Sequence, residues 1–370
     1  MRKIAFLFIE KTYSVYHTIG IAIELSKMKD VQVTAFCNNR SLALVKEILA
    51  AKKNNVNVIN VKPHWHFELP VYAEIKIQMR NLYFRKYKKE LKENDIVVST
   101  LYNELSLKDI VSKNLKMIYT SHGVSNREYS FSDKIKGYDF VLFAGEAEFQ
   151  ERKKRKQVTE NNSAVIGYPK IDVIPQTQSP IFKNINKTFL YNPHWERDHT
   201  SYFKYGKDIL RFFKDHPEYN LIFAPHSLLR ERHFKLPWEI KEFKNAENIL
   251  IDLGSERANN MTYTKLSDIY IGDYSSQALE FALLKKRPCI FIDPETAENE
   301  ERALSWQMGE VYTGITSEVL EKAINDAEKL FLERYKTKQV KIIDKLFSIP
   351  KDITSSEVAA QAIYDFAKTI

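Results

Sequence analysis

Residues Asp268–Glu280 read DIYIGDYSSQALE, and this stretch decides the class of fold. An apolar run ends at Gly272, and a helical pattern begins near Ser275. A short buried strand that passes directly into a helix is the building unit of parallel α/β sheets. Polar residues between such a strand and its helix lie at the edge of the sheet where ligands bind.

The start of the expected helix predicts an anion site. Ser275 and Ser276 supply two hydroxyls beside unpaired backbone N–H groups, which suits a diphosphate. We expect Asp273 to hold the loop or cap the helix, and Glu280, a turn further on, to meet ribose hydroxyls. The alternative is ordinary N-capping by one of the serines, which is common at helix starts.

The same alternation of β-branched runs and amphipathic stretches extends along the chain, from Lys3–Ile9 to Pro288–Ile292. It predicts an α/β protein of the GT-B type, with two doubly wound Rossmann-like domains facing across a cleft. The proline-rich segment Gly167–Lys187 reads as a linker. We therefore expect an acceptor-side domain at 1–175 and a nucleotide-donor domain at 176–370, whose last helix could pack back on the first domain.

Composition restricts the class of protein. The 370 residues suit two domains, and 44% of them are hydrophobic. Cys37 and Cys289 lie in apolar runs, so we expect buried free thiols and no disulfide framework. The apolar run after Met1 is too short for a signal peptide, and no stretch approaches a membrane span. A cytoplasmic protein is expected, and its net charge of +8 predicts acidic partners.

A basic helix is expected over 72–92. Seven basic residues lie between Lys76 and Lys92 against one acid, Glu90. Interleaved aromatic residues favour docking on an anionic membrane surface, and a solvated amphipathic helix is the alternative. Nucleic-acid binding is not expected, because no recognised module accompanies the charge. The expected membrane-facing residues are Lys76, Arg80, Arg85, Lys86, Lys88 and Lys89.

Three further loops follow expected strands and carry histidine. His122 and Gly123 follow Met117–Ser121; an imidazole there can remove a proton from an acceptor hydroxyl, and glycine permits a sharp turn near a ligand. The loop after Thr188–Asn192 brings Asn192, His194 and Arg197 toward a nucleotide or phosphate. His226 follows the strand Asn220–Ala224. The alternative in each case is a polar residue that satisfies a turn.

Taken in order, these motifs resemble the CDP-glycerol:poly(glycerophosphate) glycerophosphotransferase family of teichoic acid enzymes. The resemblance rests on His122-Gly123, Asn192-Pro193-His194-Trp195, Pro225-His226 and, most specifically, Asp273-Tyr274-Ser275-Ser276. It implies a GT-B fold, a CDP-activated alditol donor and a membrane-linked acceptor. It also implies that His122 is the catalytic base and that His226 contacts the donor phosphates. The segment Val124–Arg127 departs from the family pattern, and we assign Arg127 with Gly123 to the acceptor side.

The resulting hypothesis is a transferase that moves glycerol phosphate, or another alditol phosphate, to a hydroxyl of a lipid-linked glycan or polyol phosphate. Wall teichoic acid, capsule and O-antigen biosynthesis are the expected contexts, at the inner face of the cell membrane. The chain lacks an Asp-x-Asp motif, so we expect no tightly bound cofactor; a loosely bound Mg²⁺ stays open. The alternatives are a glycosyltransferase or epimerase that uses a UDP- or CMP-sugar, and a non-catalytic scaffold.

Overall fold

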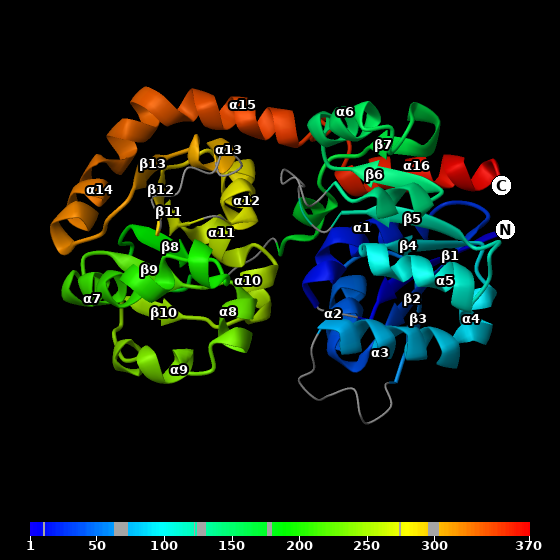
Figure 1. Ribbon diagram of the computed structural model, residues 1–370, viewed down its shortest axis with the longest axis horizontal. Coiled ribbons are helices and arrows are strands. Elements are labelled where there is room, and N and C mark those ends of the chain that lie inside the picture. Colours follow the sequence, from blue (N-terminus) through cyan, green and yellow to red (C-terminus); the bar gives the residue numbers. More distant parts are fainter. Residues whose placement is uncertain are drawn as a thin grey trace. The chain divides into compact units, whose positions relative to one another are not determined.

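The computed structural model describes residues 1–9, 12–62, 73–121, 123, 131–175, 180–273, 275–294 and 303–370. It divides into two compact units (Figure 1). Unit 1 comprises Met1–Val173 together with Lys345–Ile370, and unit 2 comprises Ile174–Asp344. The first part of unit 1 ends two residues before the boundary expected at 175. The C-terminal segment Lys345–Ile370 belongs to unit 1 rather than to the second domain.

Unit 1 is built on a seven-stranded parallel sheet with the order β3-β2-β1-β4-β5-β6-β7. Its strands are β1 (Arg2–Phe8), β2 (Val31–Cys37), β3 (Asn57–Asn60), β4 (Ile96–Ser99), β5 (Lys116–Thr120), β6 (Phe140–Phe143) and β7 (Ser163–Val165). These are largely apolar runs, as expected for strands covered on both faces. The strand order reverses between β1 and β4, which is the position where doubly wound sheets bind ligands.

Helices from both ends of the chain cover this sheet. They are α1 (Val15–Leu25), α2 (Asn39–Ala50), α3 (Ala73–Lys86), α4 (Lys88–Lys92), α5 (Ser106–Ile110), α6 (Glu146–Lys154) and α16 (Ser355–Lys368). The C-terminal helix α16 packs beside α1 (Figure 1). A Cβ at Gly20 would clash with the Ser356 hydroxyl, so a larger residue here would force that side chain or the helices to shift. The backbone N–H and hydroxyl of Ser356 both donate to Asp172 Oδ2, at 2.7 Å each.

Unit 2 repeats the architecture with a six-stranded parallel sheet of order β10-β9-β8-β11-β12-β13. Its strands are β8 (Thr188–Asn192), β9 (Asn220–Phe223), β10 (Ile249–Ile251), β11 (Ile269–Gly272), β12 (Cys289–Ile292) and β13 (Glu310–Tyr312). Its helices are α7 (Lys207–Asp215), α8 (Ser227–Arg232), α9 (Leu236–Glu239), α10 (Glu256–Asn259), α11 (Thr262–Leu266), α12 (Ser276–Leu284), α13 (Ala303–Trp306), α14 (Ser317–Leu330) and α15 (Lys336–Leu346). Here the order reverses between β8 and β11.

The predicted class, α/β with two doubly wound Rossmann-like sheets, is confirmed. The expected strand Thr188–Asn192 has the predicted bounds. The basic segment differs: its described part forms two helices, α3 and α4, that meet at Tyr87. The sequence does not predict β7 and β13, because each is an edge strand of only three residues.

The cysteines behave as expected for structural thiols. Cys37 and Cys289 are both free and buried, and desolvation raises the pKa of each thiol to about 12. Neither forms a reactive thiolate at neutral pH. Within the described ranges, no helix combines the length and apolarity needed to cross a lipid bilayer.

Candidate active site

Three loops of unit 2 meet at one edge of its sheet. They follow β9, β8 and β11, which are neighbours in that order. The first brings His226, the second begins at Asn192, and the third carries Asp273 and Ser275. This edge contains the reversal point between β8 and β11, where a doubly wound sheet leaves a crevice for ligand. The fold thus brings together the unit 2 residues that the sequence singles out.

Asn192 ties the three loops together. Its side chain is fully buried. Nδ2 donates to the carbonyl oxygen of Ala224 at 2.5 Å, next to the His226 loop. Oδ1 accepts from the hydroxyls of Ser275, at 3.1 Å, and Tyr270, at 3.2 Å. With no exposed surface, Asn192 positions its neighbours and does not itself present a polar group to solvent.

Asp273 fixes the loop that follows β8. It is also fully buried, and its carboxylate accepts from the backbone N–H of His194 at 2.7 Å. The other oxygen accepts from the backbone N–H and the hydroxyl of Ser201, at 2.6 and 2.8 Å. Burial raises the pKa of Asp273 to about 7, although these hydrogen bonds oppose the rise. Asp273 therefore holds the loop, which is one of the two roles expected for it.

The two histidines of the site have defined tautomers. Nδ1 of His226 accepts from the backbone N–H of Leu228, and Nδ1 of His194 accepts from that of Glu196, both at 3.2 Å. A nitrogen that accepts cannot carry a proton, so Nε2 bears the hydrogen in each neutral ring. The ring centroids lie 6.1 Å apart. Nε2 is thus the donor nitrogen of each ring.

Ser275 and Ser276 occupy the start of α12, as the sequence predicts. Ser275 is the N-cap, and its hydroxyl accepts from the backbone N–H of Gln277 at 3.2 Å. Ser276 is the exposed first residue of the helix. Glu280 lies one turn further and is 7% exposed. The helix therefore offers a hydroxyl and a positive dipole end at the edge of the sheet.

Arg197 lies on the exposed rim of the same loop. Its guanidinium carbon is 5.5 Å from the centre of the Phe203 ring. Sequence reasoning did not single out Ser201 or Arg232. Ser201 has no recognisable motif, and Arg232 comes six residues after His226, where its guanidinium lies 4.0 Å from the centre of the Trp195 ring. Arg232 thus adds positive charge beside Trp195, which follows His194 in the loop.

Much of the expected acceptor side lies outside the described residues. This applies to His122 and Arg127, and to the departure Val124–Arg127. Gly123 is described: its N–H donates to Ser121 Oγ at 3.3 Å, and a Cβ there would meet nothing within 4 Å. No neighbour of the described chain therefore requires glycine at this position. β5 ends at Thr120, one residue before the end expected for the strand Met117–Ser121.

The expected membrane-facing residues separate into two groups. Arg85, Lys86, Lys88 and Lys89 are exposed on α3 and α4. Arg80 is only 7% exposed, so its assignment to that surface is wrong. Its charge instead faces Glu104, whose pKa burial raises to about 7 while Arg80 opposes the rise. The side chain of Lys76 lies outside the described part.

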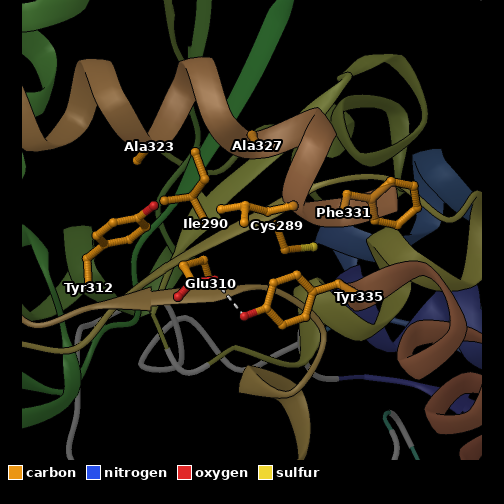
Figure 2. Close-up of a pocket in the computed structure, with 9 residues that line it drawn as sticks. Cys289, Ile290, Glu310, Tyr312, Ala323, Ala327, Phe331 and Tyr335 are labelled. Carbon is orange, nitrogen blue, oxygen red and sulfur yellow. Dashed lines mark hydrogen bonds between the residues drawn. The ribbon is translucent and has the colours of Figure 1, made fainter. Parts of the chain in front are cut away.

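Two cavities of unit 2 are lined by residues outside these loops. The smaller, of about 10 Å³, lies among β12, β13, α14 and the π-helical segment Phe331–Tyr335, with the Cys289 thiol in its wall (Figure 2). Tyr335 there donates to Glu310 Oε2 at 2.7 Å. That volume holds about one water molecule. The larger, of about 450 Å³, is lined by Asn184, Lys214 and Asn248, which come before β8, β9 and β10. Neither touches the candidate site.

Two Rossmann-like units with polar loops at a reversal point define an enzyme of the GT-B class. The chain belongs to the CDP-glycerol:poly(glycerophosphate) glycerophosphotransferase family, whose model matches residues 26–360. It is therefore a CDP-glycerol glycerophosphotransferase-like enzyme. No curated protein sequence matches it significantly.

Solved structures share the fold at low sequence identity. The wall teichoic acid polymerase TagF, soaked with CDPG, is 16% identical, with a TM-score of 0.63 over 100% of this chain and 88% of that one. UDP-GlcNAc 2-epimerase from Neisseria meningitidis, bound to UDP-GlcNAc, is 12% identical, with a TM-score of 0.63 over 100% of both chains. A putative UDP-N-acetylglucosamine 2-epimerase from Listeria monocytogenes is 13% identical, with a TM-score of 0.64 over 98% and 94%. At these identities the likeness is one of fold.

Proposed function

We propose that this enzyme transfers glycerol phosphate from CDP-glycerol to a hydroxyl of a membrane-linked glycan or polyol-phosphate acceptor. Wall teichoic acid, capsule and O-antigen biosynthesis are the contexts that use such chemistry. The acceptor oxygen forms a bond to the β-phosphorus, the bond from that phosphorus to the bridging oxygen breaks, and CMP leaves. Family membership supports the donor class. The convergence of the His226, Asn192 and Ser275 loops is the observation that carries the proposal.

On the donor side, neutral hydrogen-bond donors and the positive end of a helix bind the diphosphate. Nε2–H of His226 and of His194 donate to phosphate oxygens, since their Nδ1 atoms accept backbone N–H groups. The Ser276 hydroxyl and the N-terminus of α12 stabilise the charge that grows on the leaving CMP. Glu280 binds the ribose, and Arg197 reaches the donor from the rim.

On the acceptor side, His122 removes the proton of the attacking hydroxyl. Its position directly after Ser121, at the carboxyl end of β5, supports this role. His122→Ala should abolish CMP release while leaving CDP-glycerol binding close to that of the wild type. His216→Ala is the matched control, because His216 lies at the end of α7, with its Nδ1 2.8 Å from the carbonyl oxygen of Phe212. Full turnover by the His122 variant would refute the assignment.

A second candidate function is the use of a UDP- or CMP-sugar. The two epimerase structures share this fold, so the experiment includes sugar nucleotides. Thermal unfolding with CDP-glycerol, CDP-ribitol, UDP-GlcNAc and a CMP-sugar separates the candidates. We expect the CDP-alditols to raise the melting temperature most. No stabilisation by any nucleotide, together with no CMP release from membrane extract, would favour the non-catalytic scaffold.

The proposed reaction takes place on the cytoplasmic face of the membrane, with the enzyme bound peripherally. Exposed Arg85, Lys86, Lys88 and Lys89 support attachment to anionic lipid. No tightly bound cofactor is needed, because imidazole, arginine and helix N–H groups meet the diphosphate charge. The buried Asp273 carboxylate already accepts three hydrogen bonds, so it is poorly placed to hold Mg²⁺.

A further inference from the structure

Three aromatic side chains of unit 2 form an exposed surface that the proposed reaction does not use. Phe203 is 41% exposed, and Phe234 and Trp238 are each 70% exposed. They are the only exposed aromatic side chains among the residues whose burial the structure describes. The Phe203 ring packs edge-on against His233, the neighbour of Phe234, at 5.1 Å between ring centres. We call Phe203, Phe234 and Trp238 the aromatic patch.

The patch is held rigidly by the chain beneath it. Leu236, Ile240 and Phe243 are fully buried and follow one another at helical spacing. Trp238 is the exposed residue of α9 (Leu236–Glu239), and Phe234 is exposed in the turn that leads into this helix. His233 is held by a contact of 2.8 Å between its Nε2 and Glu239 Oε2, which also accepts from the Tyr202 hydroxyl at 3.1 Å. The exposed aromatic side chains therefore lie over a well-packed part of unit 2.

Basic residues surround the aromatic patch. Arg197 lies 5.5 Å from the Phe203 ring, and Lys235 lies 6.0 Å from the Phe234 ring. The exposed basic residues Arg230, Arg232 and Lys241 lie in the same segment, 230–242, in which Glu231 and Glu242 are the exposed acids. Exposed Trp and Phe among Lys and Arg are typical of segments that lie at the interface of anionic bilayers. Arg197 belongs to the candidate active site and lies against Phe203, so the patch borders that site.

We propose that the aromatic patch docks unit 2 on an anionic phospholipid bilayer, in addition to the basic surface of α3 and α4 in unit 1. Phe234 and Trp238 enter the interfacial layer, and the surrounding basic side chains bind lipid phosphates. A second copy of the chain fits less well, because a two-fold interface would place this basic surface against itself. The consequence for catalysis rests on the proposed function: docking brings the donor site to the layer that carries the acceptor.

The test measures vesicle binding of the full chain. The probes are phosphatidylcholine–phosphatidylglycerol vesicles, with phosphatidylcholine vesicles for comparison. Phe234→Ser with Trp238→Ser should weaken binding by roughly tenfold for each aromatic side chain removed. The matched control is Leu332→Ser with Val340→Ser, which removes two exposed apolar side chains from η12 (Phe331–Tyr335) and α15 and should leave binding unchanged. Brominated lipid should quench wild-type tryptophan emission, and Trp238→Phe should remove that quenching.

Several outcomes overturn the proposal. Equal vesicle affinity of the patch variant and the wild type refutes docking, as does binding that ignores phosphatidylglycerol. A wild-type dimer that dissociates in the patch variant shows that a second copy covers the patch instead. Failure of the proposed function is read separately: the wild type would then show no stabilisation by CDP-glycerol, whatever its vesicle affinity. The patch variant should keep the wild-type response to CDP-glycerol.

Discussion

Replacing Asn192 by alanine tests the arrangement of the site most directly. The substitution removes the bonds to the Ala224 carbonyl and the Ser275 hydroxyl, and both partners are then left without this buried amide. Tyr270 keeps a contact with the backbone oxygen of residue 192 at 3.4 Å. An unsatisfied buried group costs about 1–3 kcal/mol, so we expect a loss of about 3 kcal/mol in the free energy of unfolding. For a unit of this size that lowers the melting temperature by about 10 °C.

The functional consequence is separate from the loss of stability. Without Asn192, the His226 and Ser275 loops are no longer tied together, so affinity for CDP-glycerol should fall at least about tenfold, since positioned hydrogen bonds to charged groups contribute more than 1 kcal/mol each. Thermal unfolding measures the first effect, and calorimetric titration below the melting transition measures the second.

Asn220→Ala is the matched control for this prediction. Asn220 is equally buried, starts β9, and donates to Asn184 Oδ1 at 2.6 Å and to the Asn186 carbonyl at 3.2 Å. It lies at the opposite end of the sheet, so its loss should reduce stability without changing donor affinity. If both variants bind CDP-glycerol as the wild type does, the donor does not bind at the reversal point between β8 and β11, and our reasoning fails.

Three further predictions concern pH, the basic surface and metal. The pKa of Asp273 is raised to about 7 in the folded state, so between about pH 4 and 7 the native protein holds a proton that the unfolded chain has released. The free energy of unfolding should therefore fall as pH rises through this range. Asp273→Asn should flatten part of this slope in pH-dependent chemical unfolding, and an unchanged slope would contradict the assignment. Lys88→Glu with Lys89→Glu should weaken binding to anionic vesicles and leave the melting temperature unchanged. Arg80→Ala should instead lower the melting temperature, because it leaves Glu104 buried without its cation. EDTA should leave CMP release unchanged, and a loss of activity that Mg²⁺ restores would show that a metal takes part.

The regular part of the fold could be predicted because apolar runs and helical periodicity are local signals. Thr188–Asn192 is buried from Phe189 onward, and its β-branched and aromatic residues mark it as a strand in the sequence. Edge strands give a weaker signal: β13 has only three half-buried residues.

The sequence predicts which residues lie at the site, but it predicts less well what each of them does. Residues at strand ends converge, because parallel strands end at the same edge of a sheet. Whether a polar residue faces a ligand or holds a loop depends on burial, and Asn192 and Asp273 are both fully buried. Arg80 shows the same limit: its charge is visible in the sequence, but its burial beside Glu104 depends on residues far along the chain.

The packing of α16 on α1 makes unit 1 discontinuous, with unit 2 inserted between its two parts. During translation, β1 to β7 leave the ribosome well before α16, while unit 2 is complete beforehand. Ile19 and Ile23 of α1 belong to the same buried cluster as Ala359 and Ile363 of α16, so we expect the core of unit 1 to be completed last. A C-terminal truncation would therefore damage the N-terminal half first, and a circular permutant that begins at Lys345 would restore unit 1 as one continuous chain.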